Sequence, residues 1–395
     1  MLNSGSSSIK YELFQANGWS VLAAGLVEKI DDQSARLLHK EYSGGEEHRT
    51  EAPLSGADHR RGFAAIQAAL QKGGALELGA IGHRVVHGGE AFSAPVLIDD
   101  AVIRIIRDLI PLAPLHNPAN LLGIEVAREC YADVPQVAVF DTAFHQTMPE
   151  HASRYPLPAE LYEEHHVRRY GFHGSSHSFV SRTAADFLYI PYNRFNCIVL
   201  HLGNGASACA VKNGQSVDTS MGMTPLEGLV MGSRCGDIDP AIIFYLERNT
   251  GMGVNRIDAV LNRESGLKGL CGTNDMRELL AAKEQGSQKA ALAFDIYCYR
   301  LKKYIGAYLG ALGRIDALIF TGGIGENAAV VRKRTCQGLA GLGIVVDMKK
   351  NRSWKKGIAA IHSDDSKVKI LVVPTNEELE IASQTLKVIT ERKKR

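Results

Sequence analysis

The sequence has almost no excess of charge and no long apolar run. Its 45 lysines and arginines nearly balance its 43 aspartates and glutamates, which leaves a formal net charge of +2. A basic surface for nucleic acid or for an anionic membrane is therefore not expected. No stretch approaches the ~18 apolar residues that cross a membrane, and residues 1–4 are unlike a secretory leader. We expect a cytoplasmic protein.

The sequence also lacks the cysteine pattern of a disulfide framework or a zinc site. It contains seven cysteines, an odd number, and no C-x-x-C spacing. Free thiols in a reducing compartment are expected instead.

Two common nucleotide-binding signatures are absent. No Gly-Lys dipeptide occurs, which excludes the P-loop, and no G-x-G-x-x-G follows an apolar run, so a Rossmann dinucleotide site is not supported. Glycine itself is abundant, at 39 of 395 residues, or about 10% against a usual ~7%. Because no glycine repeat occurs, the excess favours tight loops in which the backbone approaches a ligand closely.

Short apolar runs alternate with longer stretches of helical periodicity, which predicts an α/β fold. At ~150 residues per domain, the length of 395 residues predicts two to three domains. Residues 83–89 are expected to form a turn, and Asn213 with Gly214 predicts the type I′ turn of a β-hairpin. The expected strands are 136–140, 197–202, 208–211, 317–320 and 369–373, and the expected helices are 100–109, 120–131 and 289–312.

Three glycine-rich segments are candidates for binding phosphate or a flat ring. Residues 5–10 (Gly-Ser-Ser-Ser-Ile-Lys) offer backbone N–H groups, hydroxyls and Lys10, although a flexible tail is the alternative. Residues 203–207 lie between two apolar runs, and residues 321–327 follow another. Each of these two segments could bind a ligand or simply turn the chain.

Arg84 and Arg234 stand in apolar or glycine-rich surroundings, where a guanidinium can bind carboxylate or phosphoryl oxygens. The alternative is a buried ion pair with Asp237 or Asp239. Asp141 ends an expected strand, where open α/β sheets place ligand groups, although helix capping would also explain it.

Histidines and glutamates complete the candidate residues. His173 and His177 are four apart, but the segment lacks the glutamate of H-E-x-x-H and includes a glycine, so hydrogen bonding is favoured over zinc. Before the expected last helix, Thr375 and Glu378 match a capping box. This leaves Glu377 as an oxygen ligand for Mg²⁺ or as a solvated side chain.

Taken together, these segments resemble the acetate kinase family. The resemblance implies two ribonuclease-H-like α/β domains of the acetate and sugar kinase/actin/heat-shock-chaperone ATPase superfamily, which cover 1–147 plus 379–395 and 148–378. It also implies reversible phosphoryl transfer from ATP to acetate, giving ADP and acetyl phosphate, with Mg²⁺ or Mn²⁺, in a homodimer. The similar stretches are 3–10, 82–89, 111–118, 137–149, 168–177, 201–207, 218–240, 320–327 and 374–378.

The resemblance also assigns roles by position. The implied reacting groups are Arg84, Arg234, His173 and Asp141, and the implied metal ligands are Asn3 and Glu377. The implied nucleotide contacts are Lys10, His201, Gly203, Asn204, Gly205, Asp275, Arg277, Gly323, Ile324 and Asn327. The implied methyl pocket for acetate is Val86, Leu115, Phe172 and Pro225, beside Arg84. Because a carboxylic acid of pKa ~4.3 is ionised at neutral pH, acetate needs no general base, and direct in-line transfer is expected.

The sequence departs from the family pattern at its start. The family has four or more apolar residues before the serine-rich loop, whereas Met1 and Leu2 precede Asn3 here. The first strand is therefore expected to be nearly absent, and an added apolar strand is expected to stabilise the protein. Three alternatives stay open: a propionate or butyrate kinase, a metal-dependent hydrolase that uses the histidines, and a nucleotide-gated clamp on the same fold.

Overall fold

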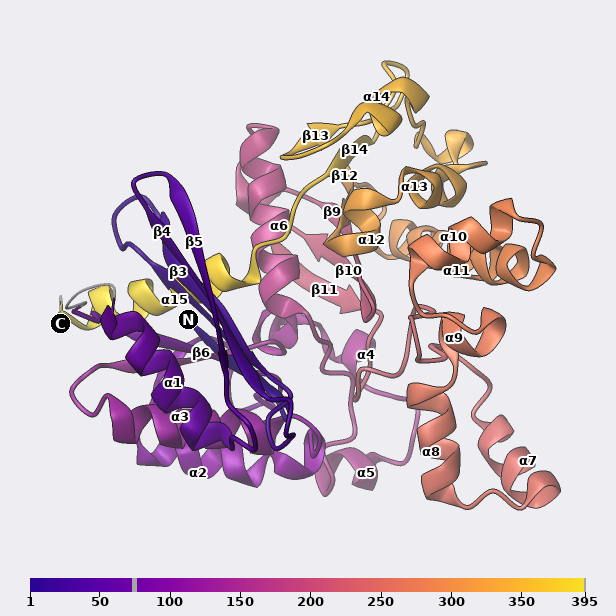
Figure 1. Cartoon of the computed structure of the whole chain (residues 1–395). Helices are drawn as coiled ribbons and strands as arrows, with labels where there is room; N and C mark the ends of the chain where they lie inside the picture. Colours follow the sequence, from indigo (N-terminus) through magenta and orange to yellow (C-terminus); the bar gives the residue numbers. More distant parts are fainter. Residues whose placement is uncertain (73–76, 394–395) are drawn as a thin grey trace. The chain divides into compact units, whose positions relative to one another are not determined.

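The computed structural model describes residues 1–72 and 77–393 (Figure 1). The chain divides into two compact units, which we call unit 1 (Met1–Phe144 with Asn376–Arg395) and unit 2 (His145–Thr375). Over the described residues, no helix combines the length and the apolar character that crossing a membrane requires.

Unit 1 is built on a mixed sheet. Its described residues form eight strands in the order β5-β4-β3-β2-β1-β6-β8-β7. Strands β1 to β5 form an antiparallel meander, while β6 and β8 run parallel to β1. The strands are β1 (Leu2–Ser4), β2 (Ser8–Phe14), β3 (Val21–Glu28), β4 (Arg36–Ser43), β5 (Glu46–Pro53), β6 (Ile81–Val85), β7 (Val96–Leu97) and β8 (Gln136–Phe140).

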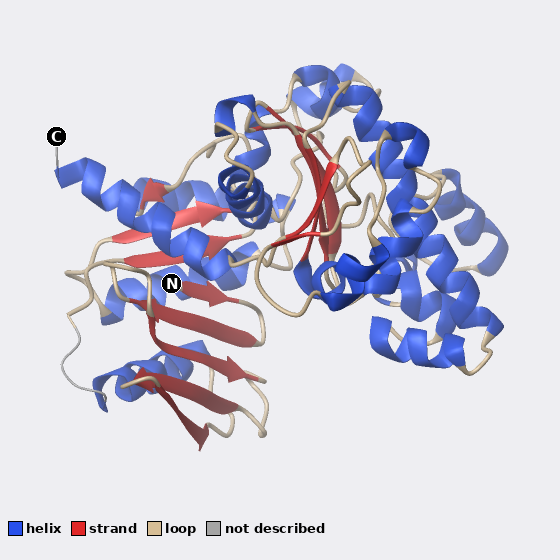
Figure 2. Ribbon diagram, turned by 90° about the horizontal axis from the view of Figure 1, so that it is seen from above, coloured by secondary structure: helices blue, strands red, loops and turns tan. Residues whose placement is uncertain are grey.

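Helices cover both faces of this sheet, as the ribbon of unit 1 shows (Figure 2). Alternate side chains of a strand point to opposite faces, and β8 follows this rule. Ala138 and Phe140 pack in the cluster that includes residues of α2 and α3, whereas Val137 and Val139 pack against α15. The helices are α1 (His59–Lys72), α2 (Asp100–Asp108), α3 (Asn117–Cys130) and α15 (Glu377–Lys393), with a short 3₁₀ turn, η1 (Ile110–Leu112).

The first strand, β1, is short but is paired on both sides. Leu2 lies opposite Tyr11 of β2 and opposite His83 of β6. The chain then reverses, and the Gly5 N–H donates to the Ser8 carbonyl at 2.8 Å. Residues 5–10 are therefore the turn and second strand of a hairpin, so the flexible-tail alternative is wrong.

A cavity of about 440 Å³ lies beyond the start of β1. Strand β2 continues past the Met1–Glu12 pair to Phe14, and Leu13 and Phe14 line one side of the cavity. Residues 78–80, which lead into β6, line another side, and Leu386 and Ile389 of α15 also line it. Apolar groups therefore border the cavity where a longer β1 would lie.

The opposite end of the sheet is the edge strand β5. All eight of its residues are exposed, and its sequence is Glu-Glu-His-Arg-Thr-Glu-Ala-Pro. It pairs with β4 along its whole length.

Unit 2 contains a second mixed sheet, whose described strands have the order β11-β10-β9-β12-β14-β13. β12 lies parallel to both β9 and β14, while β9, β10 and β11 form an antiparallel meander. The φ angles of Asn213 (52°) and Gly214 (75°) are both positive, as a type I′ turn requires. The strands are β9 (Cys197–Leu202), β10 (Ala206–Lys212), β11 (Gln215–Thr219), β12 (Ala317–Thr321), β13 (Ala359–Ala360) and β14 (Lys369–Val372).

Helices flank both faces of this sheet (Figure 2). Helix α6 contacts β9 and β12, and the long helix α11 contacts β10. The helices are α4 (Glu150–Ser153), α5 (Ala159–Glu163), α6 (Gly174–Phe187), α7 (Ala241–Thr250), α8 (Val254–Arg263), α9 (Gly266–Cys271), α10 (Met276–Glu284), α11 (Gln288–Leu312), α12 (Gly322–Asn327), α13 (Ala329–Cys336) and α14 (Met348–Ser353), with 3₁₀ turns η2 (Ala143–Thr147, which begins in unit 1), η3 (Tyr192–Arg194) and η4 (Ala340–Leu342).

The structure confirms the expected strands at 136–140, 197–202 and 317–320, and the long helix expected at 289–312. The turn expected at 83–89 is wrong in its first part, because β6 continues to Val85.

Two further local predictions are wrong. Residues 322–327 form the helix α12 rather than a turn, which three glycines in six residues concealed. The capping box at Thr375 and Glu378 does not form. Instead, the Asn376 Oδ1 accepts the Leu379 N–H at 2.9 Å, and the Glu378 carboxylate pairs with Lys10 of β2.

Candidate active site

The turn between β9 and β10 in unit 2 is the centre of the first group of candidate residues. The Gly203 N–H donates to the Gly205 carbonyl at 3.0 Å, and the Asn204 carbonyl accepts the Gly232 N–H at 2.9 Å. The first bond closes the turn itself, and the second attaches the turn to residues 222–236. A Cβ at Gly203 would lie 3.3 Å from the Gly205 carbonyl oxygen, which is a tight approach.

A cavity of about 720 Å³ lies beside this turn. It brings together seven of the residues that the sequence assigned to the nucleotide: Gly203, Asn204, Asp275, Arg277, Gly323, Ile324 and Asn327. Asn274, Met276, Leu280 and Ala328 also line it, and no motif in the sequence points to these four. Of the other three assigned residues, Gly205 lies in the same turn, His201 lies in β9, and Lys10 lies in β2 of unit 1.

One wall of this cavity is the start of α10. Asp275 caps the helix, because its side chain accepts the Arg277 N–H at 2.8 Å. The Arg277 guanidinium returns to the same carboxylate, with Nη2 2.5 Å from Oδ2. Hydrogen bonds from the side chain and backbone of Arg277 lower the pKa of Asp275 to about 2, so the carboxylate stays charged.

The facing wall is α12, which a buried arginine supports. The Arg332 Nη1 donates to the carbonyl oxygens of Gly325, at 2.9 Å, and Glu326, and its Nε donates to the Asn351 Oδ1 at 2.7 Å. Burial lowers the pKa of Arg332 to about 10. Nothing in the local sequence around residue 332 distinguishes this arginine from a surface one, so sequence reasoning missed it.

Four imidazoles gather behind the turn. The rings of His173 and His201 stack with centroids 4.4 Å apart, and His177 lies 5.6 Å from His145. Serine hydroxyls bond these rings, and the Ser176 Oγ lies 2.8 Å from the His201 Nδ1. Among the described residues, no group of three or more histidine, cysteine, aspartate or glutamate side chains is placed to hold a metal.

Arg234 and His173 face the same side of the turn. A Cβ at Gly205 would lie 3.6 Å from the Arg234 Nη1 and 3.6 Å from the His173 Nε2. The Arg234 Nη1 donates to the Pro225 carbonyl at 3.4 Å, and burial lowers the pKa of the guanidinium. Within the described part of the chain it forms no ion pair, so the predicted alternative of a pair with Asp237 or Asp239 is wrong.

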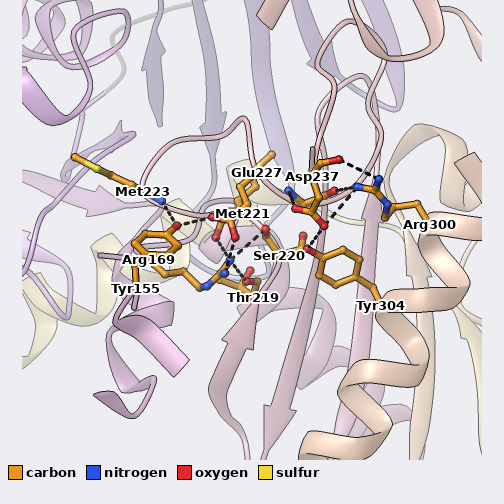
Figure 3. Close-up of polar contacts among 11 residues, drawn as sticks. Tyr155, Arg169, Thr219, Ser220, Met221, Met223, Glu227, Asp237, Arg300 and Tyr304 are labelled. Atoms are coloured by element: carbon orange, nitrogen blue, oxygen red, sulfur yellow. Dashed lines mark hydrogen bonds and ion pairs between the residues drawn. The ribbon is translucent and has the colours of Figure 1, made fainter. Parts of the chain in front are cut away.

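Arg169 holds the beginning of the segment that carries Pro225 and Arg234 (Figure 3). Its Nη1 donates to the Thr219 carbonyl at 2.9 Å and, at 3.3 Å each, to the Ser220 and Met221 carbonyls. Its Nη2 pairs with the Glu227 Oε1 at 2.6 Å. The Tyr155 hydroxyl donates to the other oxygen of Glu227 and accepts the Met223 N–H at 3.0 Å.

Arg300 and Tyr304 of α11 hold the end of the same segment (Figure 3). The Arg300 Nη1 donates to the Gly228 carbonyl at 2.8 Å, and the Tyr304 hydroxyl donates to the Asp237 Oδ2 at 2.8 Å. The Asp237 Oδ1 also accepts the Gly228 N–H at 2.7 Å. Asp237 therefore binds within this segment and to Arg300 and Tyr304 of α11. Arg234 is not among the described partners of Asp237.

Unit 1 contributes a second group of candidate residues at the ends of β6 and β8. The Arg84 Nη2 lies 2.6 Å from the Asp141 Oδ2, and its Nε contacts both carboxylate oxygens at 3.1–3.2 Å. Asp141 is buried, with 1% of its surface exposed. Burial raises the pKa of Asp141, the charge of Arg84 opposes this, and the charge of Glu377 adds to it.

The other assigned residues of unit 1 lie on neighbouring elements. Asn3 is the central residue of β1, and Glu377 is the first residue of α15. Val86 directly follows β6; it is buried, and its N–H donates to the Asn120 Oδ1 at 3.0 Å. Leu115 is 62% exposed. The two remaining pocket residues belong to unit 2, where Phe172 is buried and Pro225 is half-buried.

Comparison with known proteins identifies the family. The model of the Acetokinase family matches residues 1–383. An acetate kinase of Syntrophobacter fumaroxidans is 54% identical over 397 residues, covering 98% of this chain and 96% of that protein. An acetate kinase of Streptomyces coelicolor is 53% identical over 395 residues, covering 99% and 97%. The chain belongs to the acetokinase family.

Solved structures agree with this acetokinase assignment. The crystal structure of Porphyromonas gingivalis acetate kinase matches with a TM-score of 0.93 and 44% identity, covering 98% of each chain. A propionate kinase from Francisella tularensis gives the same TM-score, identity and coverage. The predicted α/β fold class, that of the two-domain actin-like ATPases, is thereby confirmed.

Two contacts near the acetokinase site were not foreseen from the sequence. The Lys10–Glu378 pair joins residues at opposite ends of the chain. The Arg169–Glu227 pair joins two segments 58 residues apart. Glu227 stands between Leu226 and Gly228, so no local pattern indicated the second contact, and none indicated the first.

Proposed function

We propose that this chain catalyses reversible phosphoryl transfer from ATP to acetate, giving ADP and acetyl phosphate. The observation that carries the proposal is the approach of the Arg234 Nη1 and the His173 Nε2 to Gly205, in a turn whose first residues line the 720 Å³ cavity. Cationic groups and N–H donors beside a glycine-rich turn suit phosphoryl transfer, since catalysis of this reaction is chiefly positioning and charge stabilisation.

In this proposal, the nucleoside of ATP occupies the cavity. Gly323 and Ile324 provide a flat surface for the adenine ring, and even a Cβ at Gly323 would meet open space. Asn327 supplies an amide at the edge of this surface. The turn at residues 203–205 binds the phosphates through backbone N–H groups. Lys10 and His201 are proposed as additional phosphate contacts.

The acceptor is proposed to be the ionised carboxylate of acetate, so that no general base is needed. Arg84 and Arg234 neutralise the carboxylate and the equatorial oxygens of the phosphoryl group, and His173 donates a hydrogen bond to the same oxygens. Asp141 holds the Arg84 guanidinium in place through three contacts of 2.6–3.2 Å. Transfer is direct, from the ATP oxygen to the acetate oxygen, without a phosphorylated enzyme.

The residues of unit 1 fit a divalent metal. The negative charge of Glu377 raises the pKa of Asp141, which means that the two carboxylates repel each other. A cation bound between them would offset this repulsion. One or two carboxylates completed by substrate phosphates suit Mg²⁺. We propose Asp141, Glu377 and Asn3 as its protein partners, and the ion would supply positive charge to the phosphates. Mn²⁺ has the same preference for oxygen ligands.

Acetate is proposed as the preferred acid because the curated relatives at 54% and 53% identity are named acetate kinases. The second candidate is propionate, which the equal likeness to the Francisella tularensis propionate kinase favours. The proposed methyl pocket is Val86, Leu115, Phe172 and Pro225. Because one methylene is worth only ~1–3 kcal/mol in such a pocket, propionate is expected to react more slowly, but measurably.

We also propose a homodimer that uses α7. No residue of this helix is buried, and Phe244 and Tyr245 are 57% and 59% exposed. An exposed apolar face of this kind is typical of a protein–protein contact. Sedimentation of Phe244→Glu as a monomer beside a dimeric parent would support it. All seven cysteines lie in described residues as free thiols, which supports a cytoplasmic location.

The test of the function is a hydroxamate assay for acyl phosphate with ATP and Mg²⁺, run on acetate, propionate and butyrate. We expect acetate to give the largest kcat/KM, propionate less and butyrate least. Equal values for acetate and propionate would overturn the preference for acetate. A phosphorylated enzyme that passes its group to acetate at the turnover rate would overturn direct transfer, and no acyl phosphate from any acid would overturn the proposal itself.

A further inference from the structure

A single serine hydroxyl connects two of the histidines behind the turn. Ser207 lies in β10, and its Oγ is 2.9 Å from the His173 Nδ1 and 2.7 Å from the His177 Nε2. Both Ser207 and His177 are completely buried. The three side chains therefore form a row that ends at His173, whose Nε2 faces Gly205 and Arg234.

The buried end of the row determines where the protons lie. The His177 Nδ1 is buried and has no hydrogen-bond partner among the described residues. Burial, together with the charges of His145 and His201, lowers the pKa of His177 well below 6.5, so the ring is neutral and carries one proton. An orphaned N–H donor in a protein interior is rarer and costlier than an orphaned lone pair. The proton of His177 is therefore on Nε2, the nitrogen that contacts Ser207.

This placement sets the direction of the next bond. The His177 Nε2–H donates to the Ser207 Oγ, and the hydroxyl has one proton of its own, which then points to the His173 Nδ1. The His173 Nδ1 consequently accepts, and a neutral imidazole that accepts at Nδ1 carries its proton on Nε2.

We propose that Ser207 and His177 are positioning residues that hold His173 in the tautomer protonated on Nε2. In that tautomer His173 presents an N–H donor beside the Arg234 guanidinium, on the side of the turn that Gly205 leaves open. The opposite tautomer would present a lone pair, which repels phosphoryl oxygens. The proposal rests on the role of His173 in the proposed function, because an imidazole that did not contact the phosphoryl group would not need a fixed tautomer.

The tautomer can be observed directly by ¹⁵N NMR of protein labelled at histidine. The His173 signal is assigned by its absence from His173→Gln. In the parent protein we expect the His173 Nε2 to show the shift of a protonated nitrogen and the Nδ1 the shift of an acceptor. The reverse pattern in the parent would overturn the proposal.

Ser207→Ala then tests the connection. We expect its His173 to populate both tautomers, kcat to fall about 10- to 100-fold, and KM for ATP to change less than about threefold. Ser207→Thr, which keeps the hydroxyl, is expected to restore both the NMR pattern and kcat. An unchanged His173 pattern in Ser207→Ala would overturn the proposal.

Ser216→Ala is the matched control. It removes another buried serine–histidine hydrogen bond of the same cluster, 2.8 Å to the His145 Nδ1, without touching the row that ends at His173. We expect a similar loss of thermal stability but the parental His173 pattern and kcat. If Ser207→Ala shifts the tautomer while kcat stays parental, the tautomer assignment stands and the proposed role of His173 fails. If both serine variants lower kcat equally with parental NMR patterns, the row is merely structural.

Discussion

Arg169 and Glu227 are joined by an ion pair of 2.6 Å that connects the approach to α6 with the segment bearing Pro225. The pair is largely buried, with 17% and 33% of the two side chains exposed, and the same guanidinium holds three backbone carbonyls. A break in a buried pair leaves one charge without its partner, which costs far more than the pair itself contributes.

Glu227→Gln is therefore expected to lower the free energy of unfolding by about 3 kcal/mol. It is also expected to raise KM for acetate more than it lowers kcat, because Pro225 belongs to the proposed methyl pocket. Thermal unfolding and steady-state kinetics measure the two effects. The matched control is Glu264→Gln, directly after α8, which breaks the exposed pair with Arg256 and should leave Tm unchanged. Parental Tm and KM in Glu227→Gln would contradict the expectation.

Arg84→Gln is expected to make stability depend on pH in a defined direction. Burial already raises the pKa of Asp141 above its usual 3.8 in the folded protein, and removal of the guanidinium raises it further. A folded-state pKa above the unfolded value stabilises the protein at low pH, and this contribution is lost as pH rises through the folded value. The variant should therefore be close to the parent near pH 4 and about 3–5 kcal/mol less stable at pH 8.

The measurement is the difference in unfolding free energy between variant and parent over this range of pH. The double variant Arg84→Gln/Asp141→Asn serves as its control, since it has no carboxyl group to titrate at position 141. The explanation would be refuted if the loss of unfolding free energy in Arg84→Gln did not change with pH. It would also be refuted if the double variant showed the same pH dependence as the single variant.

An apolar extension of four residues before Met1 is expected to raise Tm by about 5 °C, from burial worth roughly 2 kcal/mol. The cavity of about 440 Å³ borders Leu13, Phe14 and residues 78–80, the positions a longer β1 would pair with. A glycine-serine extension of equal length is the control and should give no such rise. Equal Tm values for the two extended proteins would show that the cavity does not accept a strand.

Both extensions should also change the response to pH. Burial lowers the pKa of the Met1 ammonium to about 6, below its usual 8.0. Between these values the unfolded state binds the proton and the folded state does not, so stability rises from about pH 6 to pH 8. An extension moves the amino terminus away, and this rise should disappear from a urea denaturation series.

Val86→Ala is expected to raise the ratio of kcat/KM for propionate over acetate about tenfold, because it makes room for a methylene in the proposed pocket. Val102→Ala is the matched control. It removes the same two methyl groups from the core around α2, so it should lower Tm and leave the ratio at the parental value. A ratio that does not change in Val86→Ala would place Val86 outside the substrate pocket.

The sequence was informative wherever the chemistry is local. The apolar runs of β9 and β12 predicted two strands, and the glycines after them marked both the turn at residues 203–205 and the wall formed by α12. Short helices such as α12 were not predicted, because glycine has a low helix propensity and a glycine-rich helix then resembles a turn in sequence.

The parts that escaped prediction depend on distant partners. Lys10 was assigned to phosphate, yet its ammonium pairs with Glu378, which was expected to cap a helix. Arg332 gives no sign in the sequence that it is buried beneath α12. Side chains that support a site through long-range contacts carry no local pattern, so a single sequence does not reveal them.

Strand β5 has a consequence for behaviour in concentrated solution. An edge strand offers unpaired backbone groups to any other strand that approaches it, and a flat apolar edge invites sheets to join. Here the edge carries three glutamates and an arginine, and it ends at Pro53, which has no N–H to donate. A second sheet that docked there would bring like charges together and leave a carbonyl without a donor. The eight-stranded sheet is thus closed to growth on this side by the residues of its last strand.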